Sequence, residues 1–378
     1  MKHHIYADNA ATTKLDPEAF EAMKPWLLEE YGNASQPYSF SRKPKKALAE
    51  ARATIAACIN ALPEEIFFTS GGTESDNWAI KGSAFSDPAH RATITSAFEH
   101  HAILRSCAAI ERLGYPVAYL SPTPDGQITP ENLASVITDK TRLVSIMFAN
   151  NEIGSIQPIK ELCAVAHAHG ALFHTDAVQA VGHVKIDVKD LGVDMLSASA
   201  HKFNGPKGIG FLYIRKGVEL SSYADGGAQE NNHRAGTENI AAIVGMATAL
   251  KGNCNSLEQN QAAILNLEKQ LLQGLNKSGI EFVRNGGNIT LPGLISISFP
   301  NKDGEAILHR LDLMGISIST GSACDSVNTQ ISHVLQSIRL QRDVSKGTIR
   351  ISLGKNNATS DVLTIVAGIE KVLLTQRQ

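Results

Sequence analysis

Closely spaced cysteines are missing from this chain of 378 residues. Its five cysteines lie far apart, and no two of them form a Cys-x-x-Cys motif: Cys58, Cys107, Cys163, Cys254 and Cys324. This pattern argues against a disulfide framework and against a cysteine-rich zinc site, so no metal site is expected. It is typical of a protein with free thiols in a reducing cytoplasm.

Long apolar runs and an excess of one charge are also absent. No run of about 18 apolar residues occurs, and residues 1–6 lack the apolar stretch of a signal peptide, so we expect a cytoplasmic protein without a membrane span. The chain has 35 basic and 37 acidic residues. This balance gives no electrostatic reason to expect direct binding of nucleic acid or of a membrane surface, and it favours a small metabolite as the ligand.

Short apolar strands alternate with helices over the first two thirds of the chain. A helix is expected to begin at Asp16-Pro17-Glu18 and end near Gly32, and a second to cover residues 45–59. Helix 159–169 then lies between two of the strands expected at residues 66–69, 93–95, 143–149, 171–175, 195–199 and 209–214. This order predicts an α/β fold with a mostly parallel, doubly wound sheet, which binds ligands beyond the carboxyl ends of its strands.

After about residue 255 the pattern changes. A long helix is expected at residues 257–276, strands at 294–299, 316–319 and 348–353, and a last helix at 360–374. Because 378 residues are too many for one ordinary core, we expect two domains. Residues 16–255 would form the large domain, and residues 1–15 with 256–378 the smaller α+β domain.

A lysine and an aspartate follow two of the predicted strands. Lys202 precedes a turn rich in glycine and proline and suits a Schiff-base lysine, although a surface lysine would give the same pattern. Asp176 closes strand 171–175 and could pair with a protonated pyridine nitrogen, or could instead cap a helix. Gln179, three residues further on, could hydrogen-bond a ring hydroxyl.

A glycine turn and a histidine follow two other strands. The turn Gly71-Gly72-Thr73-Glu74-Ser75 opens a predicted helix, where backbone N–H groups and the Thr73 hydroxyl could hold a phosphate, although a loop with a helix cap looks alike. Its glutamate does not fit a nucleotide-binding P-loop. His100 could stack on a flat ring or move protons, and the adjacent His101 leaves a surface histidine pair as the alternative.

Two further candidates lie in the predicted small domain. Cys324 is surrounded by small residues in Ser319-Thr320-Gly321-Ser322-Ala323-Cys324-Asp325-Ser326, which predicts an exposed loop whose thiol can reach a substrate, unless the thiol is simply buried. Arg350 could clamp a carboxylate from strand 348–353, or be a charge on an edge strand. A phosphate cup at Thr73, a pyridine partner at Asp176 and an aldehyde-binding Lys202 together predict pyridoxal 5'-phosphate as the cofactor.

With these motifs the chain resembles the NifS/IscS-type cysteine desulfurases, in the class V aminotransferase branch of the fold-type I pyridoxal-phosphate enzymes. The resemblance covers nearly the whole chain, from Tyr6-Ala7-Asp8-Asn9-Ala10-Ala11-Thr12-Thr13 to Arg350-Ile351-Ser352-Leu353-Gly354. It also includes these segments: Phe68–Asn77, Asn150-Asn151-Glu152-Ile153-Gly154, His174–Gln179, the Lys202 segment, Arg234-Ala235-Gly236-Thr237 and Gly321-Ser322-Ala323-Cys324.

The resemblance implies a role for each matching residue. Lys202 would bind the cofactor covalently, Asp176 and Gln179 would hold its ring, and His100 would stack on it. Its phosphate would contact Thr73, Ser199, His201 and, across a homodimer interface, Thr237. Arg350 and Asn151 would bind the carboxylate of L-cysteine, and Asn151 would also contact the cofactor. Cys324 would take the substrate sulfur as a persulfide, leaving alanine, and pass it to an acceptor protein.

The resemblance is incomplete at two places and leaves the sulfur acceptor open. This chain has Gly32-Asn33-Ala34-Ser35-Gln36-Pro37-Tyr38 where relatives usually have Gly-Asn-Pro-Ser-Ser-His, and Gln330-Ile331 where they have Glu-Pro. The alternative functions are a selenocysteine lyase, another class V enzyme, or an inactive scaffold for sulfur-handling proteins. The acceptor could serve iron–sulfur cluster assembly, tRNA thiolation or DNA phosphorothioation.

Overall fold

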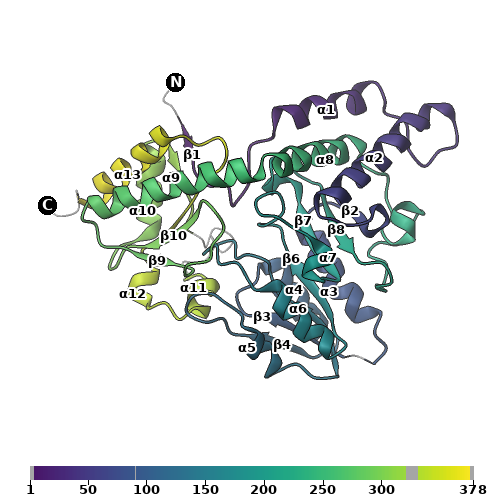
Figure 1. Cartoon of the computed structure of the whole chain (residues 1–378), viewed down its shortest axis with the longest axis horizontal. Helices are drawn as coiled ribbons and strands as arrows, with labels where there is room; N and C mark the ends of the chain where they lie inside the picture. The colour runs from purple at the N-terminus through teal and green to yellow at the C-terminus, as the bar shows by residue number, and fades with distance from the viewer. Residues whose placement is uncertain (1–3, 90, 321–330, 375–378) are drawn as a thin grey trace.

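A seven-stranded sheet organises the larger part of the molecule (Figure 1). The computed structural model describes residues 4–89, 91–320 and 331–374. The strand order is β2 (Ile66–Thr69), β8 (Gly210–Ile214), β7 (Met195–Ser199), β6 (Leu172–Asp176), β5 (Thr141–Ser145), β3 (Ala92–Ser96) and β4 (Val117–Leu120). Strand β8 runs antiparallel to both of its neighbours, and the other pairs are parallel. The predicted α/β fold with a mostly parallel sheet is confirmed.

Helices surround this sheet; the first begins where its sequence signals place it, whereas the helix expected at residues 45–59 covers 42–58. Asp16 caps the first helix by accepting the N–H of Glu18 at 2.9 Å, with Pro17 in the first turn, although the helix ends at Leu28 and not near Gly32. The α-helices of this part are α1 (Pro17–Leu28), α2 (Arg42–Cys58), α3 (Gly72–Phe85), α4 (His101–Glu111), α5 (Pro130–Ala134), α6 (Ile159–Ala168), α7 (Val188–Leu191) and α8 (Ile240–Asn255). Short 3₁₀ turns are η1 (Ser39–Ser41), η2 (Pro63–Glu65), η3 (Ala200–Lys202) and η4 (Gln229–Asn232).

A second hydrophobic core joins the two ends of the sequence. The antiparallel sheet β12 (Thr348–Ser352), β10 (Leu294–Ser298) and β9 (Val283–Asn285) contributes to it, and β1 (Ile5–Tyr6) pairs in parallel with β11 (Ile316–Ser317). The helices of this part of the chain are α9 (Leu257–Lys277), α10 (Gly304–Leu313), α11 (His333–Ser337), α12 (Arg342–Ser345) and α13 (Thr359–Leu374). Helices α9, α10 and α13 pack in the second core, whereas Val334 and Leu335 of α11 pack in the first. Ile5 and Ala7 pack in the second core with residues 264–373. The domain boundaries given above stay a prediction.

The strand predictions fail mainly at the edges of the sheets. Strands β4 and β9 were not expected, and both are edge strands with exposed side chains, so they lack a continuous apolar run. Strand β5 ends at Ser145, because the buried residues 146–149 continue as irregular backbone that still bonds to the end of β6. Among the described residues no helix combines the length and the apolar character needed to cross a bilayer.

Candidate active site

The candidate catalytic residues gather beyond the carboxyl ends of β3, β6 and β7. Asp176 is the last residue of β6, Lys202 closes the turn after β7, and His100 precedes α4. One side-chain atom each of Asp76, His100 and Asp176 lie within 4.8 Å of one another. The positive charge of Lys202 is close enough to act on both Asp176 and His100. The sheet therefore places a lysine, a carboxylate and an imidazole in one site.

Lys202 reaches across to the N-terminal segment. Its Nζ donates hydrogen bonds to the carbonyl oxygens of Ala10 and, at 3.0 Å, of Ala11. The side-chain amide of Gln179 donates to the same Ala10 carbonyl at 3.0 Å. These two residues, which the motifs assigned to the cofactor ring, thus meet at one backbone oxygen.

Asp176 is a buried carboxylate that caps no helix. Its Oδ1 accepts the N–H of Val178 at 2.9 Å in a turn, and the next helix begins only at Val188, so the helix-cap interpretation is wrong. Burial raises the pKa of Asp176 to about 6, while the Val178 N–H and the charge of Lys202 oppose that rise. Near neutral pH the carboxylate is therefore available to pair with a cation.

A second carboxyl next to Asp176 has a raised pKa. Asp76, on α3, is buried, and burial together with the charge of Asp176 holds its pKa well above the usual range. His174 lies beside it, between the hydroxyls of Ser145 and Ser197 at 2.9 Å each, and burial lowers its pKa to about 3. Asp76 and His174 thus both favour their uncharged forms on this side of Asp176, whereas Lys202 acts on Asp176 with a positive charge.

His100 presents a neutral imidazole to the same space. Its Nδ1 accepts the N–H of Ala102 at 3.1 Å, which leaves the proton on Nε2. Burial, and then the positive charges of Lys202 and the neighbouring histidines, lower its pKa to about 4. His101 is not simply a surface partner of His100, because its ring lies 4.8 Å from that of His333.

The predicted phosphate turn forms a glycine-lined start to α3. Gly71 has φ of 149° and offers no side chain to the first turn of the helix, so N–H groups there face outward. A Cβ on Gly71 would lie 3.4 Å from the Ser199 hydroxyl, and one on Gly72 would lie 2.5 Å from Val178. Thr73 is exposed at this turn. The backbone, Thr73 and Ser199 could therefore receive a phosphate together.

Two residues predicted near the phosphate have other contacts. His201 Nδ1 shares a 3.1 Å hydrogen bond with the Thr12 hydroxyl, and burial lowers its pKa to about 4. Thr237 is exposed and lies three residues after Arg234, whose Nε is 2.8 Å from Oε1 of Glu74 in the phosphate turn. Neither contact tests their assignment to phosphate.

Arg350 and Asn151, which the motifs assign to the substrate carboxylate, contact each other. Arg350 lies on β12, an outer strand of the three-stranded sheet, but it is buried, and it donates to the Asn151 carbonyl at 2.8 Å and to Asp8 at 2.7 Å. Its Nε has no hydrogen-bond partner among the described residues. The side-chain amide of Asn150 holds the turn that contains Asn151. Its Nδ2 donates a hydrogen bond to the Phe98 carbonyl, and its Oδ1 accepts the N–H groups of Glu152 and Ile153.

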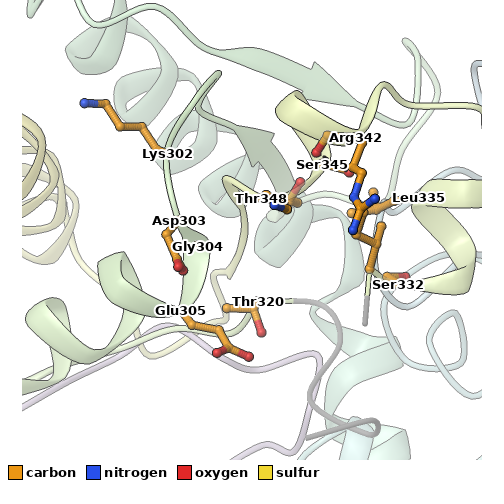
Figure 2. Close-up of a pocket in the computed structure, with 12 residues that line it drawn as sticks. Lys302, Asp303, Gly304, Glu305, Thr320, Ser332, Leu335, Arg342, Ser345 and Thr348 are labelled. Carbon is orange, nitrogen blue, oxygen red and sulfur yellow. Dashed lines mark hydrogen bonds between the residues drawn. The ribbon is translucent and has the colours of Figure 1, made fainter. Parts of the chain in front are cut away.

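Cys324 lies outside the described residues. The chain on each side of it, at Thr320 and Ser332, lines a cavity of about 360 Å³ between α10, α11, α12 and β12 (Figure 2). Asp76, Glu99 and Asp8 are the polar residues that sequence reasoning missed. Each stands inside or beside a motif already identified, but a buried acid has no signature that separates it from an exposed one.

Residues 5–365 match the family Aminotransferase class-V. The chain is 44% identical to the cysteine desulfurase IscS of Dictyoglomus turgidum, over 99% of this chain and 95% of that one. It is also 44% identical to the IscS of Methanosarcina thermophila, over 98% and 92%.

Solved structures give the same result. A NifS-like protein superposes with a TM-score of 0.93 at 35% identity, covering 99% of this chain and all of that one. DndA of Streptomyces lividans superposes with a TM-score of 0.78 at 33% identity, over 92% and 99%. The chain therefore belongs to the class V aminotransferase family, as one of its NifS/IscS-type cysteine desulfurases.

Proposed function

We propose that this cysteine desulfurase binds pyridoxal 5'-phosphate through Lys202 and transfers the sulfur of L-cysteine to Cys324. The observation that carries the proposal is the meeting of Lys202, Asp176 and His100 beside the glycine turn of α3. Separate strands supply these three groups, and their chemistry matches the aldehyde, ring nitrogen and ring face of this cofactor.

The residues present fit the cofactor. The glycine turn leaves room and backbone N–H groups for its phosphate, with the Thr73 and Ser199 hydroxyls beside them. Asp176 would pair with the ring nitrogen, Gln179 would bond the ring hydroxyl, and His100 would stack on the ring. The cofactor, when bound, supplies an electron sink that makes the substrate α-proton acidic.

Arg350 and Asn151 would hold the substrate carboxylate. The guanidinium is already oriented by Asp8 and by the Asn151 carbonyl, and its Nε, which has no hydrogen-bond partner in the described part of the chain, adds a buried donor. Fixing the carboxylate there would orient the substrate amine toward Lys202. Lys202 could then accept the α-proton once its amine is released, and His100, with a proton on Nε2, could hydrogen-bond the substrate thiol.

Cys324 would carry out the sulfur transfer. Its thiolate attacks the substrate sulfur, an S–S bond forms, and the C–S bond breaks with its electron pair left on the substrate carbon. That carbon takes a proton, and alanine leaves. A reducing thiol, or the thiol of an acceptor protein, then removes the outer sulfur from Cys324, which regenerates the enzyme in the cytoplasm.

The test is to supply L-cysteine and a reductant and to assay alanine and sulfide together. Equal amounts are expected from the wild type. Lys202→Ala should lose the yellow absorbance and both products, whereas Cys324→Ser should keep the absorbance and lose sulfide release. Sulfide release by Cys324→Ser at the wild-type rate would refute the sulfur step. A preference for L-selenocysteine with little turnover of L-cysteine would favour the selenocysteine lyase alternative.

We further propose that the enzyme acts as a homodimer. Apolar side chains are exposed together along α1 and the segment after it: Phe20, Leu27, Leu28, Tyr31, Tyr38 and Phe40. Leu28 and Tyr31 are 76% and 73% exposed. Such patches mark interaction surfaces, and a second copy would cover this one while bringing its Thr237 to the phosphate.

Mixed dimers test this arrangement. If Thr237 acts in the partner's site, combining Thr237→Ala with Lys202→Ala subunits restores one intact site per mixed dimer. Activity should therefore rise well above that of either variant alone. No recovery in a dimer whose subunits have been shown to mix would place Thr237 in its own subunit's site.

A further inference from the structure

Two of the cysteines lie at adjacent helix ends, away from the catalytic residues. Cys58 is the last residue of α2, and Cys254 is the last residue but one of α8. These two helices pack along each other (Figure 1). Both thiols are only half-buried, whereas Cys107 and Cys163 are fully buried.

The two thiols contact each other. The interaction between the two thiols is the first cause that raises the pKa of Cys58, and it is also the first cause that lowers the pKa of Cys254. Of the pair, Cys254 is therefore the thiol that ionises more readily. A thiolate beside a protonated thiol is the arrangement from which disulfides form.

Solvent can reach the pair through a cavity of about 650 Å³. Both cysteines line it, and so do the exposed residues Asn60 and Asn255. Cysteines that serve only as small apolar residues are usually fully buried, as Cys107 and Cys163 are. Cys58 and Cys254 differ from them, because both thiols line an accessible cavity that has room for a small oxidant.

We propose that Cys58 and Cys254 form a redox-active dithiol, which a peroxide closes to a disulfide and a low-molecular-weight thiol reopens. The Cys254 thiolate attacks one peroxide oxygen, the O–O bond breaks, and protonation of the released hydroxide gives water and a sulfenic acid. The Cys58 sulfur then attacks that sulfur and displaces a second water. Two thiols are thus oxidised, and one hydrogen peroxide is reduced to two waters.

The bond would fasten the junction between the two cores. Helix α8 packs in the first hydrophobic core, and Ser256 alone separates it from α9, which packs in the second core. A disulfide at Cys254 would tie this junction to the end of α2. We therefore expect the oxidised form to resist unfolding better than the reduced form.

The experiment treats the cofactor-loaded Cys324→Ser protein with hydrogen peroxide, so that the loop thiol does not compete. Blocking with an alkylating reagent and non-reducing peptide mass spectrometry should give a Cys58–Cys254 cross-link, loss of two alkylatable thiols and an upward shift of the urea midpoint. Dithiothreitol should reverse all three. Cys58→Ser and Cys254→Ser should each abolish the cross-link, and the matched control Cys163→Ser should keep it.

Other results would overturn the proposal. These are two thiols that stay alkylatable, sulfinic acid in place of the cross-link, or a cross-link to a different cysteine. With Cys324 present and the reductant in excess, Cys58→Ser should release sulfide at the wild-type rate. Because the cross-link is measured in a protein that lacks Cys324, its failure would not depend on the outcome of the desulfurase assay.

Discussion

Replacing Glu99 with glutamine should remove a large, pH-dependent cost of folding. Glu99 is fully buried next to His100, and burial raises its pKa from 4.5 to about 8. Its Oε1 accepts hydrogen bonds from the Ser96 hydroxyl at 2.6 Å and the Met147 N–H at 2.9 Å. Its Oε2 has no hydrogen-bond partner among the described residues.

The direction in which pH changes the stability follows from proton binding. An acid whose pKa is higher in the folded protein than in the unfolded chain binds more protons when folded, so stability falls as the pH rises from about 4.5 to about 8. One pKa unit corresponds to about 1.4 kcal/mol. Raising the pH from 5 to 8.5 should therefore lower the free energy of unfolding of the wild type by about 4 kcal/mol through Glu99. For a chain of 378 residues this loss of stability corresponds to a fall in Tm of about 5 °C.

A glutamine keeps the shape and cannot ionise. Its carbonyl can accept both hydrogen bonds, and its amide meets the same apolar surroundings as a protonated Oε2. We expect Glu99→Gln to be near wild-type stability or somewhat below it at pH 5, and to gain about 4 kcal/mol relative to the wild type by pH 8.5.

Thermal and urea unfolding of both cofactor-free proteins at the two pH values measures this difference. The other titrating groups are present in both proteins and largely cancel. A difference between variant and wild type that changes by less than about 1 kcal/mol with pH would mean that Glu99 is not held neutral, and the burial argument would fail.

Three further predictions concern the site itself. Arg350→Lys should raise KM for L-cysteine about 10- to 100-fold with a smaller change in kcat, because lysine cannot keep the contacts to Asp8 and Asn151 while binding a carboxylate at two points. Steady-state kinetics measure both constants, and an unchanged KM would contradict this prediction. Because the pKa of His100 is about 4, this imidazole should not titrate between pH 5.5 and 8. An acid limb of kcat in that range that disappears in His100→Asn would refute that value. Gly72→Ala places a Cβ 2.5 Å from a Val178 methyl and should weaken cofactor affinity at least tenfold, measured by spectral titration of the apoprotein.

The sequence predicted the parts of the site that depend on strand ends. The bounds of β2 and β7 were expected to the residue; Asp176 ends β6 and Lys202 lies just after β7, two strands whose apolar runs are plain. A parallel sheet brings its carboxyl ends to one edge, so residues far apart in sequence could be placed together without any knowledge of the distances.

The groups that tune the site could not be predicted in this way. Asp76 lies one residue after Ser75 in the phosphate motif, and Glu99 directly precedes His100, yet both read as ordinary acids in the sequence. Their buried state depends on how α3 and the backbone after β5 pack against β6 and β7, which is a tertiary property. The contact between Cys58 and Cys254 depends in the same way on how two helix ends meet.

The buried charges of the site balance around Asp176. Three carboxyl groups lie near one another, but burial holds the pKa of Glu99 at about 8 and that of Asp76 well above its usual range. Glu99 therefore stays neutral near pH 7, whereas Asp176, whose pKa is about 6, ionises and faces Lys202. A protonated pyridine nitrogen would then meet a single negative charge in a low-dielectric site, where the pairing is strongest. A negative charge on Glu99 or Asp76 would raise the pKa of Asp176 and weaken that pairing, so the raised pKa values of both acids favour it.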